Sequence, residues 1–195
     1  MKLLPGNETV LAIPAFLNAA GVPQLVHATN GSVAPIDAPT KAILDSYITK
    51  TAPSAANPTL GGNLSGAIRD DLALGLTGSE RSTSRTITSV GRNEALTFFN
   101  FQANLTVFLD ADRALSSASV FNLARISTRV QGLPYVLAHR LGRRNTDAAV
   151  VGEDWSYFYA ETGQPVPGYG DGDEQTIALN FVPKNIVNIA AALGA

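Results

Sequence analysis

The sequence predicts a mainly β protein: a β-sandwich or partial barrel with one flanking α-helix at about residues 114–130, long loops and terminal arms. Within residues 96–109, apolar and polar side chains alternate from Phe99 to Val107, as they do in a strand with one covered face. Further short alternating runs are separated by Gly- and Pro-rich stretches. A convincing helical pattern occurs once, so the helix must pack on a sheet face or close an open end of the sandwich.

The strand expected at 96–109 has an uncharged polar face. Its apolar parity is Phe99, Phe101, Ala103, Leu105, Val107 and Leu109, and its polar parity is Asn100, Gln102, Asn104 and Thr106. The strand is longer than the usual ~5–6 residues. A long, uncharged, two-faced strand favours a sheet that is shared between subunits or lines a passage. An ordinary central strand with one solvated face fits the pattern equally well.

Several elements are expected before the long strand. Strands are predicted at 9–16 and 22–28, a long Pro/Gly-rich loop at 34–63 with one short helix at 40–48, a strand at 64–76 that bends near Asp70, and a short strand at 85–90. A loop as long as 34–63 is usually functional or bound to a neighbour; a disordered linker is the alternative.

The helix at 114–130 has an imperfect apolar stripe and ends before Gly132-Leu133-Pro134. Strands are expected after it at 135–141, 155–161 and 176–182, the last with Ile177, Leu179 and Phe181 facing inward. The apolar tail 185–195 is interpreted as a C-terminal strand or arm. Length and continuity indicate a single domain over 1–195.

The composition limits the function classes. Charged residues make up 15% of the 195-residue chain, against about 25% in typical proteins, which hints that part of the surface is covered in an oligomer. The net charge of −2 and a short basic cluster, Arg140, Arg143 and Arg144, do not favour duplex binding. Because the chain has no cysteine, disulfides and thiolate sites are excluded.

The sequence offers little catalytic chemistry. It contains no nucleophile elbow, no phosphate-binding loop and no spaced pair of histidines. We interpret His139 as a partly buried structural residue, and the acidic run at Asp171, Asp173 and Glu174 as a solvated hairpin tip in preference to a calcium loop. We therefore expect no enzyme activity, no cofactor and no metal. No stretch is long enough to span a bilayer, and Pro14 interrupts the early apolar run that imitates a signal peptide.

Aromatic residues near the C-terminal half support one alternative from another class. Trp155, Tyr157, Tyr159 and Tyr169 could form the sugar-stacking platform of a β-sandwich carbohydrate-binding module. Core packing is the competing interpretation, and an exposed, coplanar Trp155 and Tyr157 would favour the platform.

Four segments together resemble one family. They are Arg69-Asp70-Asp71-Leu72-Ala73-Leu74-Gly75-Leu76-Thr77, Ser84-Arg85-Thr86-Ile87-Thr88-Ser89-Val90-Gly91, Leu96 to Leu109 with its Phe-Phe-Asn-Phe-Gln-Ala core, and Tyr135-Val136-Leu137-Ala138-His139-Arg140-Leu141-Gly142. The chain resembles the major tail tube proteins of long-tailed, non-contractile bacteriophages, of the kind found in phages of actinobacteria. The likeness runs from about Asn63 to Pro183.

The resemblance implies a ring-forming structural protein of the virion tail, made in the cytoplasm of the bacterial host. Hexameric rings would stack into a tube, with Asn100, Gln102, Asn104 and Thr106 as candidate lumen-facing residues. Its partners would be other copies of itself, the tape measure protein and the tail-end proteins, with non-specific passage of DNA. A tail terminator or a capsid decoration protein is the alternative within the virion.

Overall fold

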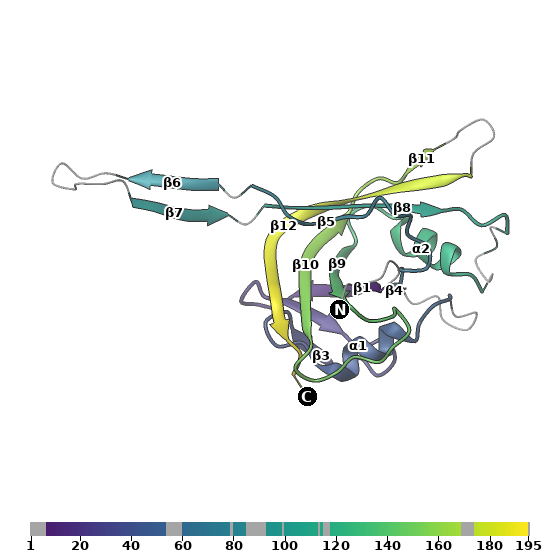
Figure 1. Ribbon diagram of the computed structural model, residues 1–195, viewed down its shortest axis with the longest axis horizontal. Helices are drawn as coiled ribbons and strands as arrows, with labels where there is room; N and C mark the ends of the chain where they lie inside the picture. Colours follow the sequence, from purple (N-terminus) through teal and green to yellow (C-terminus); the bar gives the residue numbers. More distant parts are fainter. Residues whose placement is uncertain are drawn as a thin grey trace.

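Figure 1 shows the computed structural model, in which the prediction of a mainly β fold is confirmed. The structure describes residues 7–53, 60–78, 80–84, 93–98, 100–112, 114, 118–168 and 174–194, with the backbone alone for 80–84 and 93–98. A ten-stranded antiparallel sheet has the order β3-β2-β1-β9-β10-β12-β8-β5, with β4 paired to β1 and β11 paired to β12. A separate two-stranded sheet, β6-β7, projects from the body as an arm (Figure 1).

The strands are β1 (Glu8–Leu17), β2 (Pro23–Val26), β3 (Val33–Pro35), β4 (Gly62–Asn63), β5 (Ala73–Leu76), β6 (Glu80–Ser84), β7 (Asn93–Phe98), β8 (Phe101–Phe108), β9 (Pro134–Leu141), β10 (Asp154–Thr162), β11 (Val166–Gly168) and β12 (Thr176–Ala192). The helices are α1 (Lys41–Ile48) and α2 (Val120–Thr128).

The central strands β1, β9 and β10 are buried on both faces, which produces two cores. One core lies against α1 and contains Leu11, Trp155 and Tyr157. The other lies against α2 and the apolar face of β8, and contains Leu137 and Phe158. This is why β1 and β9 are apolar almost throughout, since a strand covered on both sides has no solvated parity.

The helix that covers the first core follows from its sequence spacing. The buried residues of α1 are Ile43, Leu44, Tyr47 and Ile48, which occupy one face of a helix. The Tyr47 hydroxyl donates to the Val26 carbonyl at 2.9 Å and so ties α1 to β2. The short helix predicted at 40–48 is thus confirmed as α1. The sheet has two flanking helices where one was expected at 114–130, because α1 and α2 cover opposite faces of the central strands.

The second helix is shorter than predicted. Residues Ala114 and Ala118 are not helical, and α2 begins at Val120; residues 113 and 115–117 lie outside the described residues. The Asn122 amide donates to the Ala114 carbonyl and the Ala114 N–H donates to the Asp112 carboxylate at 3.0 Å. These local contacts give the backbone around Ala114 an alternative to helical hydrogen bonds.

β12 is the strand that joins the two parts of the sheet. Its first residues pair with β8, and the rest pair with β10 around a corner (Figure 1). Register shifts interrupt the β10 pairing, and Asn185 and Ala190 have φ values of 58° and 51° on β12. Bulges bend a strand and increase its twist. They therefore allow β12 to pair with β8 in one orientation and with β10 in another. Residues 185–192 thus continue β12.

Two predicted strands are divided in space. Residues 96–109 are split between β7 in the arm and β8 in the body, with the break before Phe101. The segment 64–76 is a strand only at 73–76, although Ile68 forms an isolated bridge with Val107. Pairing with β8 is interrupted at 70–72, near the predicted bend. The strand predicted at 85–90 lies outside the described residues.

Candidate assembly surface

The upper sheet in Figure 1 consists of β5, β8, β11 and the first part of β12, and β8 shows the predicted alternation. Phe101, Ala103, Leu105 and Val107 are buried in the core against α2, which confirms the apolar parity over the described part of the strand. Gln102 and Asn104 are exposed, and Thr106 is half-buried. Phe99 lies outside the described residues.

Asn100 is the one candidate that lies apart from this row. It precedes β8 and its Nδ2 donates to the Gly78 carbonyl at 3.2 Å, while its own carbonyl accepts from Thr77 at 2.8 Å. These contacts close the base of the arm. The structure therefore groups Gln102, Asn104 and Thr106 on one surface and places Asn100 at its margin.

Neighbouring strands extend the row into an uncharged surface. Asn104 is paired with Ala73 on β5 and Asn180 on β12, Gln102 with Gly75, and Thr106 with Ala178. Paired residues of an antiparallel sheet point to the same side, so these side chains share the outer face. We call Ala73, Gly75, Gln102, Asn104, Thr106, Ala178 and Asn180 the outer face.

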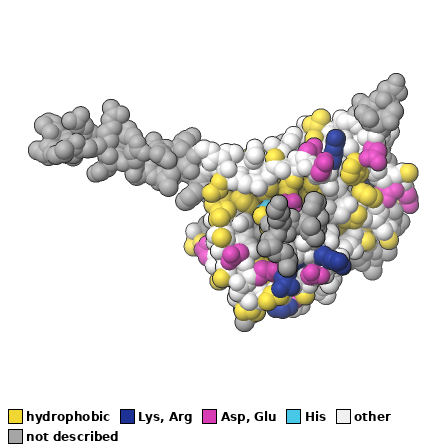
Figure 2. Space-filling model, in the orientation of Figure 1, with side chains coloured by type: hydrophobic (Ala, Val, Ile, Leu, Met, Phe, Trp, Pro, Cys, Tyr) yellow, Lys and Arg dark blue, Asp and Glu magenta, His cyan; other side chains and the backbone are white. Residues whose placement is uncertain are grey.

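A salt bridge lies at the margin of the outer face. Glu161 of β10 and Lys184 of β12 approach to 2.8 Å, and both are partly exposed. In Figure 2 the part of the upper sheet next to the arm shows no charged side chain, whereas charged side chains are seen on the lower body, at the right-hand end and in the upper part of the body between them. The outer face itself carries no charged side chain in the part that the structure describes.

Sequence reasoning did not assign the β5 and β12 members of the outer face. A signal for Asn180 was present, because Ile177, Leu179 and Phe181 were expected to face inward and Asn180 has the opposite parity. β5 and β12 are the neighbours of β8 because of long-range strand pairing. The alternation of side chains along one strand does not show which strands will pair with it.

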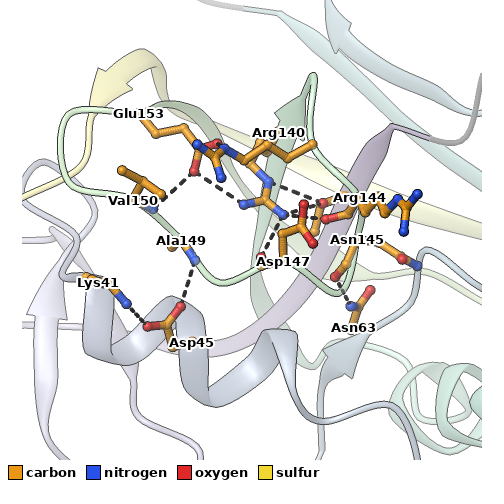
Figure 3. A network of polar contacts seen from close by, with 12 residues as sticks. Lys41, Asp45, Asn63, Arg140, Arg144, Asn145, Asp147, Ala149, Val150 and Glu153 are labelled. Carbon is orange, nitrogen blue, oxygen red and sulfur yellow. Dashed lines mark hydrogen bonds and ion pairs between the residues drawn. The ribbon is translucent and has the colours of Figure 1, made fainter. Parts of the chain in front are cut away.

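In the lower body, by contrast with the outer face, charged side chains form a polar network around Arg140 (Figure 3). Its side chain is fully buried and bridges to the Glu153 carboxylate at 3.3 Å. It also donates to the carbonyls of Arg144 and Asp147 at 2.8 and 3.0 Å and lies 4.9 Å from the Trp155 ring centroid. The guanidinium thus holds loop 142–153 against β9.

Further contacts anchor the same loop. The Ala149 N–H donates to the Asp45 carboxylate at 2.8 Å, and Asp45 also pairs with Lys41 (Figure 3). Arg143 binds the second oxygen of Glu153 at 3.0 Å. The basic cluster of the sequence is therefore not a continuous surface patch, since Arg140 points into the protein.

The two histidines have structural partners. His139 Nε2 lies 2.6 Å from the Glu8 carboxylate, and its side chain is 14% exposed, as the structural interpretation predicted. His27 Nδ1 accepts from the N–H groups of Thr29 and Asn30 at 3.1 and 3.3 Å in a turn. Both imidazoles are engaged in local contacts.

The proposed sugar platform is contradicted by burial. Trp155, Tyr157 and Tyr159 are 1%, 0% and 4% exposed and belong to the core against α1. A sugar cannot stack on rings that the protein already covers. The rings face inward because β10 is covered on both sides; Tyr169 lies outside the described residues.

The described part of the chain offers neither a metal site nor a helix that could span a membrane. No group of three or more His, Asp and Glu side chains there has an arrangement that could hold a metal ion. Nor does either of the described helices have the length and apolar character needed to cross a membrane.

An open antiparallel sheet with a projecting arm and a neutral outer face defines a structural protein suited to assembly. The chain belongs to the phage tail tube protein family, whose model matches residues 13–194. It is accordingly a structural component of the virion tail that self-assembles into a tube. No curated protein matches the chain.

Proposed function

We propose that the chain is the tube subunit of a long-tailed, non-contractile phage of the actinobacteriophage type. Its copies form hexameric rings that stack into the conduit for genome delivery. The outer face lines the lumen, and the working partners are other copies, the tape measure protein and the tail-end proteins. The subunit is made in the host cytoplasm and acts without catalysis or cofactor.

The observation that carries the lumen assignment is the chemistry of the outer face. Gln102, Asn104 and Asn180 present neutral amides, and their neighbours Ala73, Gly75 and Ala178 are small. A protein that holds DNA neutralises phosphates with Lys and Arg, and each such contact strengthens binding. A neutral surface leaves a polyanion free to slide, which is what a conduit requires.

Open sheet edges support assembly into rings. Within the upper sheet, β5 pairs with β8 and β11 pairs with β12. Among the residues that the structure describes, the other edge of each of these two strands pairs with no further strand. An exposed strand edge is a template for pairing with another chain. Because β5 and β11 are different strands, their contact would be head-to-tail and could close into a ring.

The arm supports the same conclusion. β6 pairs with β7 in a sheet of its own, and Figure 1 shows the pair extending away from the body. A two-stranded hairpin is marginally stable alone in water. We infer that another copy in the assembled tube covers the arm, and that tail tubes are thereby strengthened between rings.

Electron microscopy of the concentrated protein tests the assembly. Hollow rings or tubes are expected, and uniformly small particles under all nucleating conditions would contradict the proposal. The lumen assignment is tested with Gln102→Lys/Asn104→Lys, which should fold normally because both side chains are exposed, yet retain DNA and impair its passage. The matched control Ala42→Lys/Gln131→Lys adds the same charge at exposed positions elsewhere. Equal infectivity of both variants would rule out the outer face as lumen.

A further inference from the structure

A cavity interrupts the β5 edge of the upper sheet. Residues 67–69 run beside β8, where the Arg69 N–H donates to the Thr106 carbonyl at 2.7 Å and Ile68 bridges to Val107. The chain then leaves β8 at 70–72 and returns to it as β5. A cavity of about 460 Å³ opens at this break and reaches back to β1.

The cavity is lined by apolar and polar side chains. Val10, Ile68 and Leu72 supply the apolar side chains, and the polar or charged ones come from Glu8, Ser65, Arg69, Asp70 and Asn145. Asp70 is 97% exposed, and its ion pair with Arg69 is long, at 3.8 Å. The volume lies in the range of sites that accept side chains or small ligands. Arg69 and Asp70 are exposed, whereas Glu8, Ser65 and Asn145 are half-buried. An inserted side chain would therefore find apolar contact at Ile68 and Leu72, with polar groups beside it.

The edges of the sheet are unequally protected. β5, Ala73–Leu76, has neither charge nor proline, and Leu76 is 47% exposed. β11 contains Pro167, and the second half of β12 contains Pro183, Lys184 and two irregularities. Proline, charge and bulges are the devices that discourage pairing at an edge. β5 is thus the edge best able to receive a strand.

We propose that the cavity beside β5 is the socket for the β11 segment of a second copy of this chain. The inference rests on the proposed tube function and names the contact between neighbours in a ring. An extended segment laid along β5 passes over the break at 70–72, so its inward side chains enter the cavity. Strand addition with pockets for alternate side chains is an established mode of recognition.

The side-chain chemistry of β11 fits the socket. Pro167 is paired with Ile177, which faces the core, so Pro167 points toward the body side of the sheet, as the cavity does. Val166 is paired with Ala178 and belongs to the opposite side. Because proline lacks an N–H, a three-residue strand with Pro167 gains little from main-chain pairing. Apolar contact of Pro167 with Leu72 and Ile68 provides the binding energy that main-chain hydrogen bonds do not.

Cysteine cross-linking tests the contact, because the chain has no cysteine of its own. In assembled tubes of Asp70→Cys/Pro167→Cys, a short bismaleimide should link neighbours into a ladder of covalent oligomers. The matched pair Asp70→Cys/Ala42→Cys should give no ladder. Asp70→Cys alone should also give none, since a head-to-tail contact does not bring two copies of one residue together.

The outcomes separate the two proposals. Tubes that form without a ladder overturn the socket and leave the tube function standing. Covalent dimers from Asp70→Cys alone also overturn the socket, because they report a two-fold contact. Failure to form tubes or rings with the unaltered protein under any nucleating condition overturns the tube function and the socket with it.

A charge placed in the socket provides a second readout. Leu72→Arg should abolish sedimentable tubes while the free subunit keeps its thermal midpoint, because Leu72 is only half-buried and a guanidinium at this position can reach solvent. Val33→Arg makes the same kind of change at a 51% exposed position of β3, at the far end of the sheet order. It should assemble as the unaltered protein does. Equal assembly of both variants would contradict the socket.

Discussion

The lower body and the outer face of the upper sheet treat charge in opposite ways. In the lower body, Arg140 is fully buried and the Glu153 carboxylate that it binds is 14% exposed. On the outer face, Gln102 and Asn104 are exposed and neutral. Charge is thus withdrawn into the interior where a loop must be held, and absent from a solvated surface where charges cost least.

The difference shows that charged side chains are distributed unevenly over the protein and are not simply scarce throughout it. A buried ion pair is costly to desolvate and is retained where several hydrogen bonds accompany it, as around Arg140. An exposed sheet face could carry Lys and Glu at little cost, so its neutrality needs another reason. The lumen role that we propose for the outer face supplies such a reason, because a neutral surface does not hold a polyanion.

The largest effect is expected from the buried network. Arg140→Ala should destabilise the fold by about 3–5 kcal/mol, because it leaves Glu153 and two loop carbonyls without their buried partner. Urea unfolding of the free subunit measures this free energy. The matched variant Arg143→Ala removes a 47% exposed partner of the same carboxylate and should cost about 0–1 kcal/mol. Equal losses for the two arginines would show that burial is not what distinguishes them.

The two faces of β8 should also differ. Phe101→Ala should cost about 3 kcal/mol, because the ring is 4% exposed and lies 5.3 Å from the Phe158 ring. Gln102→Ala, one residue further on the exposed face, should stay within about 0.5 kcal/mol. Urea unfolding compares them directly. A large loss for Gln102→Ala would mean that the outer face is structural in the free subunit.

The pH dependence of stability should report on a second partly buried cation, the amine of Lys50. Lys50 donates to the Leu60 carbonyl at 3.1 Å, and burial lowers the pKa of its amine to about 8. The unfolded chain binds this proton more tightly, so stability should rise with pH above about 8, by on the order of 1 kcal/mol. Lys50→Met should remove the rise when chemical unfolding is repeated across pH.

The buried tyrosines determine the pH at which this rise in stability ends. Burial raises the pKa values of Tyr47, Tyr135 and Tyr157 above their usual value. Unfolded tyrosines ionise near pH 10 while the folded ones stay protonated, so stability should fall beyond about pH 10. Continued stabilisation at higher pH would contradict the burial of these hydroxyls.

The smallest effect concerns the strand that connects the two regions. Ala190 has φ of 51°, a conformation that costs an L residue about 1–2 kcal/mol. Ala190→Gly should therefore stabilise by up to about 1 kcal/mol, after the added backbone entropy of glycine is subtracted. Asn185→Gly should change less, because Asn tolerates this region. A destabilised Ala190→Gly variant would show that the bulge is held by its methyl contacts.

The sequence by itself determined the local patterns. Strict alternation over 101–107 predicted a strand with one covered face, because successive side chains of a strand point to opposite sides. The spacing of Ile43, Leu44, Tyr47 and Ile48 likewise matched one face of a helix. Both patterns depend on a few neighbouring residues, so they are visible without any knowledge of the fold.

The tertiary structure decided which elements meet. Arg140 belonged to a basic cluster in the sequence, yet it is buried because β9 is covered on both faces and Glu153 lies beside it. Asn180 joins Asn104 because β12 pairs with β8, and the break at 70–72 becomes a cavity only beside that sheet. Long-range pairing selects one arrangement among many of similar local quality, and this selection is made by the packing of the whole chain.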